Sequence, residues 1–231
     1  MTMIKTNENG RSMIEMLGVL AIIGVLSVGG IAGYSKAMNK FKTNKIADNI
    51  SMLVANIKTL YAQQNTYAGL NNGTAVAMGV VPDELGTAYS GTGDSATATL
   101  TNAFNGSVLI KASSSTAEGD NKAFSIVFNN ISREACITLA TNDWGSGYSS
   151  GLIALQASGG AQSLGDKGDF ATFADSKIGC SGKAAAGDAN AAVAIACPGG
   201  TANKVPLSVT QAAKACNCTA GNSCSIALKY Y

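Results

Sequence analysis

Histidine is absent from this chain of 231 residues, and charged residues make up only 13% of it. The absence of histidine removes Ser-His-Asp and Cys-His catalysis, histidine-containing zinc sites and the commonest general base near neutral pH. Lys and Arg number 16 against 14 Asp and Glu, so the formal net charge of +2 gives no electrostatic reason to expect a nucleic acid partner. The composition therefore disfavours an enzyme, and no cofactor is expected.

Cysteine is missing from the first half of the chain. All six cysteines lie in the second half: Cys136, Cys180, Cys197, Cys216, Cys218 and Cys224. An even number of cysteines suits disulfides formed in an oxidising compartment. The 27 glycines, together with many Ala, Ser, Thr and Asn residues, are typical of loop-rich secreted β structure. The chain length suits one domain with an anchoring segment.

An uncharged apolar run, MLGVLAIIGVLSVGGIA, extends from Met16 to Ala32. With Gly33 and Tyr34 it reaches the ~20 residues that a helix needs to cross a bilayer. The alternative is a secretory signal peptide, which has a shorter apolar core of about 7–15 residues and a small-x-small cleavage site. No good site of that kind follows here, because an amphipathic helical pattern continues past the small residues. The run is therefore interpreted as a membrane span.

The apolar residues after the span recur at spacings of four and three. They are Ile46, Ile50, Leu53, Ile57 and Leu60. This spacing keeps them on one face of a helix. One helix is therefore expected from near Ser12 to about Gln64, with a length of roughly 80 Å at about 1.5 Å per residue. A coiled coil is the alternative, but the apolar face covers too few heptads and lacks a clean seam.

Glu15 places a carboxylate inside the edge of the apolar segment, where an unpaired charge costs about 2.5–3.5 kcal/mol at the helix centre on insertion scales. The stretch Gly10-Arg11-Ser12-Met13-Ile14-Glu15 resembles the type IV prepilin signature. In that family a membrane peptidase cuts after the glycine, the new amino terminus is N-methylated, and a glutamate at the fifth mature position pairs with the terminal amine of a neighbouring subunit. The resemblance implies cleavage between Gly10 and Arg11, methylation of Arg11 and a role for Glu15 in assembly.

Three features differ from the family pattern or from the expected orientation. Arg11 stands where the family usually has an apolar residue, and the segment from Lys36 to Lys45 carries more positive charge outside than Lys5 and Arg11 carry inside. The proline often found in the family's anchor is absent, and four glycines occur there instead: Gly24, Gly29, Gly30 and Gly33. These glycines predict either local melting of the helix during assembly or close packing of small residues in the membrane.

Beyond Gln64 the sequence turns to short elements, after a loop opening from Asn65 to Gly73. Alternating or β-branched runs predict strands at Val108 to Ala112, Phe124 to Phe128, Leu152 to Gln156, Ala192 to Ala196 and Ser225 to Lys229. Two helices are also predicted: Arg133 to Ala140 behind Ser132, and a helix through Ala215 behind the capping box of Ser208 and Gln211.

The resemblance implies an α+β structure with the type IV pilin fold, in which a long N-terminal helix packs on an antiparallel β-sheet and disulfides bound the C-terminal region. Local likenesses to the type IVb branch occur at Tyr67 to Leu70, Ile131 to Cys136 and Leu207 to Cys216. The implied organisation is a cleaved leader at 1–10, a long helix at 11–64 with its transmembrane part at 11–34, and a periplasmic or extracellular globular domain at 65–231.

The spacing of the six cysteines alone does not choose a pairing. The resemblance to type IVb pilins implies a domain-defining bond between Cys136 and Cys216, each at or near the end of a short predicted helix. The other expected pairs are Cys180 with Cys197 and Cys218 with Cys224, and Cys218 could replace Cys216. A zinc site of Cys180, Cys216, Cys218 and Cys224 is the alternative. Structural zinc sites favour C-x₂₋₄-C knuckles and exported chains favour oxidation, so no metal is expected.

The leading interpretation is a type IV pilus subunit that polymerises through its N-terminal helix into a surface filament for adhesion, aggregation or motility. Expected partners are other copies of itself, the prepilin peptidase, the inner-membrane pilus assembly machinery, the inner membrane before assembly, and a receptor on a host or sister cell. A minor pilin or a type II secretion pseudopilin is the alternative within the family. A membrane-anchored periplasmic enzyme or binding domain is the alternative of another class. The expected location is the bacterial inner membrane, then the extracellular filament.

Overall fold

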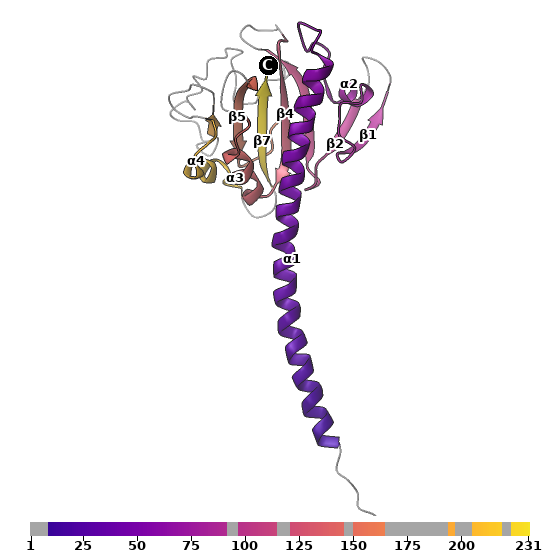
Figure 1. The fold of residues 1–231 in the computed structure, drawn as a ribbon, viewed down its shortest axis with the longest axis vertical. Helices are drawn as coiled ribbons and strands as arrows, with labels where there is room; N and C mark the ends of the chain where they lie inside the picture. The colour runs from indigo at the N-terminus through magenta and orange to yellow at the C-terminus, as the bar shows by residue number, and fades with distance from the viewer. Residues whose placement is uncertain are drawn as a thin grey trace, which may run out of the picture. The chain divides into compact units, whose positions relative to one another are not determined.

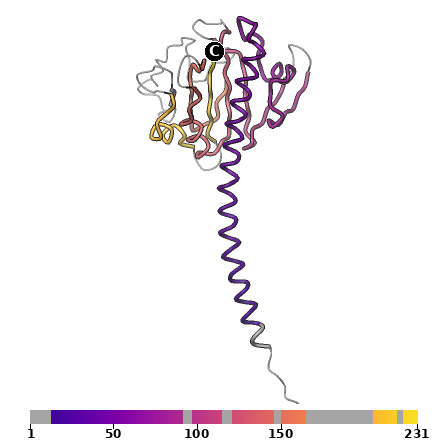
Figure 2. Tube along the Cα trace, viewed as in Figure 1, coloured from indigo at the N-terminus to yellow at the C-terminus, as the bar shows by residue number. Residues whose placement is uncertain are grey.

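The computed structural model describes residues 9–91, 97–114, 121–145, 150–164, 194–196, 205–218 and 223–231. The chain divides into two compact units, Met1–Phe41 and Lys42–Tyr231. Helix α1 (Asn9–Leu60) supplies the described part of the first unit and continues into the second. Figure 1 labels the elements, and Figure 2 traces the Cα path, coloured from indigo at the N-terminus to yellow at the C-terminus.

Helix α1 confirms the long N-terminal helix, although its ends differ from the predicted ones. It begins at Asn9 rather than near Ser12, and it ends at Leu60 rather than near Gln64. Beyond Leu60 the backbone tightens, because the N–H of Gln64 donates to the carbonyl of Tyr61 at 2.8 Å. This bond spans three residues instead of four, so the α-helical ladder stops.

Within the described residues, seven strands form one antiparallel sheet in the order β1-β2-β3-β4-β7-β5-β6. They are β1 (Gly86–Ser90), β2 (Thr97–Thr101), β3 (Ser107–Ser113), β4 (Ala123–Ile131), β5 (Leu152–Ser158), β6 (Ala194–Ala196) and β7 (Cys224–Tyr230). The last strand in sequence, β7, lies between β4 and β5, so Leu228 is flanked by Ile126 on one side and by Leu155 on the other. The end of the chain thus completes the middle of the sheet.

The core of the Lys42–Tyr231 unit lies between the second part of α1 and one face of the sheet, as Figure 1 shows. On α1 the predicted stripe is buried at its first four positions: Ile46, Ile50, Leu53 and Ile57 are fully inaccessible. On the sheet, alternate residues of β4 and β7 face the same cluster: Phe124, Ile126, Phe128, Ile226, Leu228 and Tyr230. The α+β class, with a long helix packed on an antiparallel sheet, is confirmed.

Two short helices form where the sequence predicted them. Helix α3 (Arg133–Thr141) starts behind Ser132, whose hydroxyl accepts a hydrogen bond from the N–H of Ala135 at 3.2 Å. Helix α4 (Val209–Ala215) starts behind Ser208, which exchanges hydrogen bonds with Gln211 in the predicted capping box. Such a box satisfies backbone donors that the first turn leaves open.

Three elements were not predicted. Helix α2 (Asn72–Ala77) begins at the end of the segment expected as a loop and continues beyond it, and its capping box joins the side chains and backbones of Asn71 and Thr74. Strands β1 and β2 were also missed. The other strands lie where expected, although residues 192 and 193 of the predicted strand that contains β6 are outside the described ranges.

Truncation of Ile50 to alanine tests the contribution of the buried stripe. Ile50 is fully buried, so we expect Ile50→Ala to lower the free energy of unfolding by about 2–5 kcal/mol through lost burial and a residual cavity. Met52 lies on the same helix with 53% of its surface exposed, and Met52→Ala should change it by less than about 0.5 kcal/mol. Urea unfolding of the full chain in detergent measures both. Equal losses would contradict this packing.

Candidate functional site

The first part of α1 presents a continuous apolar surface that is exposed along the described residues of its own unit. Its large apolar side chains are between 51% and 75% exposed: Met13, Ile14, Met16, Leu17, Val19, Leu20, Ile22, Ile23, Val25, Leu26, Val28, Ile31 and Tyr34. The helix is long and apolar enough to cross a membrane. An apolar surface of this extent is unfavourable in water, so it marks a membrane or protein contact.

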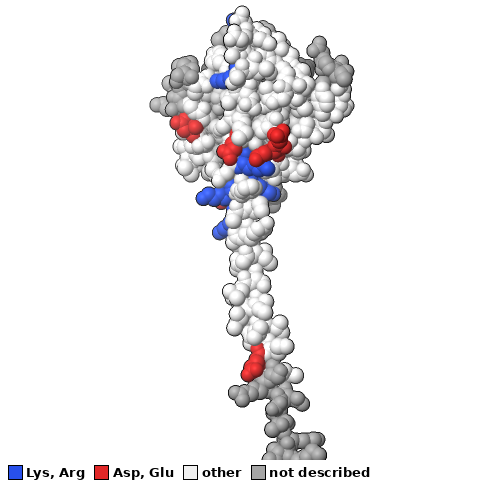
Figure 3. Space-filling view, turned by 45° about the vertical axis from the view of Figure 1, so that its right-hand side comes forward, with Lys and Arg blue, Asp and Glu red and all other residues white. Residues whose placement is uncertain are grey.

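Glu15 is exposed within that apolar surface. No other residue between Ser12 and Ser35 is charged. In Figure 3 this part of α1 is white apart from acidic atoms near its described start. A carboxylate at such a position is expensive in lipid, which makes it a candidate for a specific interaction.

The predicted cleavage site lies in the first turn of α1. The helix begins at Asn9, so the bond between Gly10 and Arg11 is part of the helical backbone rather than of an extended leader. The first N–H groups of a helix have no partner within it, and this turn is therefore the easiest part of the helix to unwind. Cleavage here requires that unwinding, since a protease must reach an extended peptide.

The glycines of the apolar segment lie on open surface. A Cβ added at Gly24, Gly29, Gly30 or Gly33 would meet nothing within 4 Å beyond the helix's own nearby backbone. Helix α1 is continuous through all four positions. Nothing in the described part of this unit requires glycine for space. The two explanations given above, local melting and close packing against another helix, therefore both concern an environment outside that part.

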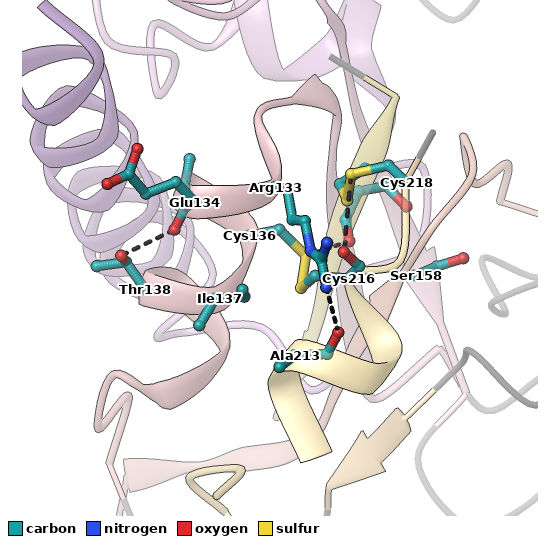
Figure 4. Close-up of a disulfide and its surroundings, with 12 residues drawn as sticks. Arg133, Glu134, Cys136, Ile137, Thr138, Ser158, Ala213, Cys216 and Cys218 are labelled. Carbon is teal, nitrogen blue, oxygen red and sulfur yellow. Dashed lines mark hydrogen bonds between the residues drawn. A yellow bond between two sulfur atoms is a disulfide. The ribbon is translucent and has the colours of Figure 1, made fainter. Parts of the chain in front are cut away.

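The predicted bond between Cys136 and Cys216 is present and joins α3 to the end of α4. The sulfurs are 2.04 Å apart, the Cα atoms are 5.9 Å apart, and 80 positions separate the two residues in sequence. Both cysteines are fully buried. Figure 4 shows the bond between the two helices, with Arg133 donating from its guanidinium to the carbonyl of Ala213 at 3.4 Å.

The predicted bond between Cys218 and Cys224 is also present, and it ties the segment after α4 to the start of β7. The expected partners Cys180 and Cys197 lie outside the described residues. The zinc alternative required ligands from Cys216, Cys218 and Cys224. In the structure the Sγ atom of each of these residues is bonded to another sulfur. A disulfide sulfur is not a thiolate, so these three residues offer no zinc ligands in this state.

Lys58 makes two contacts with the globular part that the sequence pattern did not predict. Its ammonium donates to the carbonyl of Ser150 at 2.8 Å and lies 5.0 Å from the centre of the Tyr230 ring. Partial burial lowers the pKa of Lys58 below its ordinary value, and burial raises the pKa of Tyr230. No spacing in the sequence connects Lys58 with Ser150 or Tyr230, which lie far from it along the chain.

The lysines of α1 in the second unit have partners on the globular part. Lys42 lies over the Phe104 ring with its ammonium 5.4 Å from the centroid, and Lys45 forms an ion pair with Glu84 at 3.6 Å. Because the Glu84 side chain is 53% exposed, water screens this pair and its contribution to stability is small.

The sequence of this chain is similar to those of known proteins. A family model described as "PilS N terminal" matches residues 40–228. The chain is 30% identical to the toxin coregulated pilin of Vibrio cholerae over 166 residues, which cover 72% of this chain and 70% of that protein. It is 25% identical to the major structural subunit of the bundle-forming pilus of Escherichia coli O111:H- over 170 residues, 73% of this chain and 82% of that protein.

Two solved structures are also similar. The type IV b pilin from Salmonella typhi has a TM-score of 0.44 at 17% identity, with 79% of this chain and 95% of that chain covered. A type IV pilin from Vibrio cholerae El Tor has a TM-score of 0.47 at 18% identity, with coverages of 82% and 99%.

The two described disulfides should differ in their effect on stability because they close loops of different length. In the chain-entropy model, loss of the Cys136–Cys216 bond lowers the free energy of unfolding by about 4.5 kcal/mol, and loss of the Cys218–Cys224 bond by about 2 kcal/mol. Each pair is replaced by two alanines so that neither cysteine of the pair is left as a thiol. Urea unfolding followed by the fluorescence of Trp144, which lies just after α3, measures the difference. Equal losses would contradict the loop argument.

Proposed function

This chain belongs to the type IV pilin family, and from that premise we propose that it is a structural subunit of a type IVb-like pilus. The family is structural rather than enzymatic, and the bundle-forming relative is described as a major structural subunit. The observation that carries the proposal is the exposed apolar surface of the first part of α1. A pilus subunit uses such a surface in two states: it contacts lipid before assembly, and it contacts other copies of the subunit in the filament.

The apolar segment holds the newly made chain in the inner membrane, and the same segment forms the interior of the filament after assembly. Both environments remove the apolar side chains from water, which is the dominant favourable term in each state. Charged residues return at Lys36, so the uncharged stretch has the length of one bilayer crossing. The Lys42–Tyr231 unit then lies outside the membrane, where its disulfides form.

Processing and assembly depend on the residues at the start of α1. We infer that the prepilin peptidase cuts between Gly10 and Arg11, and that the amine of Arg11 is then methylated. Glu15, the only charge in the apolar surface, pairs with the Arg11 amine of a neighbouring copy at the filament base. A buried ion pair of this kind serves register more than stability.

The other partners follow from this cycle. The assembly machinery of the inner membrane adds each subunit, and the exposed surface of the globular unit contacts a receptor on a host or sister cell in adhesion, aggregation or motility. A major subunit is favoured over a minor pilin or a pseudopilin because the bundle-forming relative is a major subunit. An anchored enzyme would need neither Gly10 nor Glu15.

A substitution that raises the helix propensity at position 10 tests whether cleavage occurs after Gly10. Gly10→Ala strengthens the first turn by about 1 kcal/mol, which opposes its unwinding, so we expect slower cleavage and accumulated precursor. Gly18→Ala strengthens α1 by a similar amount at an open position farther along and should leave cleavage unchanged. Intact-mass measurement of wild-type filaments should place the mature terminus at Arg11. A terminus elsewhere would contradict the assignment.

Removal of the Glu15 charge separates membrane insertion from assembly. Glu15→Ala deletes a charge from the apolar segment, so insertion should be retained or improved while filament yield falls strongly. Glu15→Asp keeps the charge with a shorter reach and should give an intermediate yield. Membrane fractionation and the amount of pilin in sheared filaments provide the two measurements.

The control for this variant is Met16→Ala, which truncates the exposed apolar neighbour of Glu15 and leaves the charge in place. It should retain filaments. Normal filament yield from Glu15→Ala would remove the assembly role, and loss of membrane insertion in the same variant would show that the residue acts before assembly.

A further inference from the structure

The two described disulfides meet at one place. The Sγ atoms of Cys136, Cys216 and Cys224 all lie within 4.8 Å of one another. Cys136 is bonded to Cys216, while Cys224 is bonded to Cys218. One sulfur of the second disulfide therefore lies directly beside the first disulfide, and Figure 4 shows Cys218 next to the pair formed by Cys136 and Cys216.

Access from solvent differs sharply among these four cysteines. Cys136, Cys216 and Cys224 are fully buried, whereas Cys218 is partly exposed and follows the exposed residue Asn217. A thiol outside the protein must contact a sulfur to exchange with it. We call Cys136, Cys216, Cys218 and Cys224 the cysteine cluster. Within this cluster, the sulfur of Cys218 is therefore the one that such a reagent can attack first.

We propose that the Cys218–Cys224 bond is a redox modification site through which an external dithiol opens the buried Cys136–Cys216 bond. A thiolate of the dithiol attacks the Sγ of Cys218, forms a mixed disulfide and leaves Cys224 as a thiolate. The second thiol of the reagent then attacks the mixed disulfide, so the reagent becomes a disulfide and Cys218 becomes a thiol. The two electrons that reduce the Cys218–Cys224 bond come from the dithiol.

The released Cys224 thiolate performs the next step inside the protein. It attacks the Sγ of Cys136 or of Cys216, forms a new bond to that sulfur, and the electron pair of the broken Cys136–Cys216 bond leaves on the other sulfur as a thiolate. No further electrons are needed, because one disulfide is exchanged for another. The buried bond is thus opened without contact between that bond and the reagent.

The backbone around Cys224 favours this exchange. Cys224 opens β7 and pairs with Ile131 of β4, so the sheet holds its position after its own disulfide is lost. Cys216 is held at the end of α4 and Cys136 within α3. Reacting groups held this close have a high effective concentration, so exchange within the cluster competes well with release of Cys224 to solvent.

The natural partner is an oxidoreductase with a dithiol site, which fits a disulfide with one accessible sulfur and a folded protein around it. Exchange within the cluster changes which elements are joined. A bond from Cys216 to Cys224 links α4 to β7 and frees α3, whereas a bond from Cys136 to Cys224 links α3 to β7 and frees α4. Either product keeps one disulfide between β7 and one of these two helices.

A matched pair of single variants in the full chain tests the proposal. Cys218→Ser leaves Cys224 without its partner beside the buried bond, and Cys224→Ser leaves Cys218 without its partner at the partly exposed position. Each protein is purified, its thiols are blocked with N-ethylmaleimide at low pH, and its disulfides are mapped without reduction. Cys218→Ser should yield peptides that join Cys224 to Cys136 or Cys216. Cys224→Ser should retain Cys136–Cys216 with Cys218 alkylated.

The proposal is wrong if Cys218→Ser contains only the Cys136–Cys216 bond with Cys224 fully alkylated. It is also wrong if Cys180 or Cys197 is recovered joined to Cys136, Cys216 or Cys224 in that variant. These outcomes are independent of whether filaments form, because both variants lie in the Lys42–Tyr231 unit and the mapping needs only purified protein.

The wild-type protein provides a second measurement that does not depend on how the variants fold. Partial reduction with dithiothreitol, followed by the same blocking and mapping, should give a species with one cluster bond in which Cys224 is joined to Cys136 or Cys216. Opening of the Cys136–Cys216 bond should be several-fold slower in Cys224→Ser than in wild type. Equal rates, or a first species alkylated only at Cys218 and Cys224, would overturn the relay.

Discussion

Burial of one face of α1 is the interaction on which the rest of the Lys42–Tyr231 unit depends. The four buried positions from Ile46 to Ile57 cover the inner face of the central strands, which would otherwise expose two phenylalanines and several aliphatic side chains to water. At the end of the helix the same core continues as a row of rings, with Tyr67 between Tyr61 and Phe124 at centroid distances of 5.1 and 4.8 Å. Lys58 adds a polar contact beside this row.

Much of this arrangement was predictable because it follows from periodicity. Spacings of three and four residues identified the buried face of α1, and alternation identified the central strands, whose inner residues are large and apolar. The hydroxyls of Ser132 and Ser208 marked the starts of α3 and α4 because an N-cap is a local interaction. In each case the signal and the structure lie within a few residues of each other.

The missed elements lack that local signal. Strand β1 is exposed at all five positions, so neither of its faces is buried and its sequence has no alternation of apolar and polar residues that would predict a strand. Helix α2 has only six residues, and its capping box uses Asn71 and Thr74 instead of the usual Ser or Thr with Glu or Gln. The strand order could not be predicted from the sequence either, because β7 lies between β4 and β5 and this pairing joins segments that are far apart in sequence.

The candidate site divides in the same way. Gly10 and Glu15 were identified by a short motif, and the Cys136–Cys216 pair was implied by family resemblance rather than by spacing. The adjacency of Cys224 to that pair depends on the register of β7 against β4, which places Cys224 opposite Ile131. No sequence pattern carries that register, so only the structure brings the two disulfides together.

The apolar part of α1 also sets what can drive assembly in the function proposed above. Lipid tails are as apolar as leucine, so moving this surface from bilayer to filament changes its hydrophobic free energy little. The hydrophobic effect therefore retains the subunit in the membrane but does not select the filament. The selective terms must differ between the two environments, and two features of the segment do. The Glu15 charge is costly in lipid, and its proposed pair with an amine offsets part of that cost and fixes the register of the subunits. The open glycines permit close helix contact that lipid cannot match.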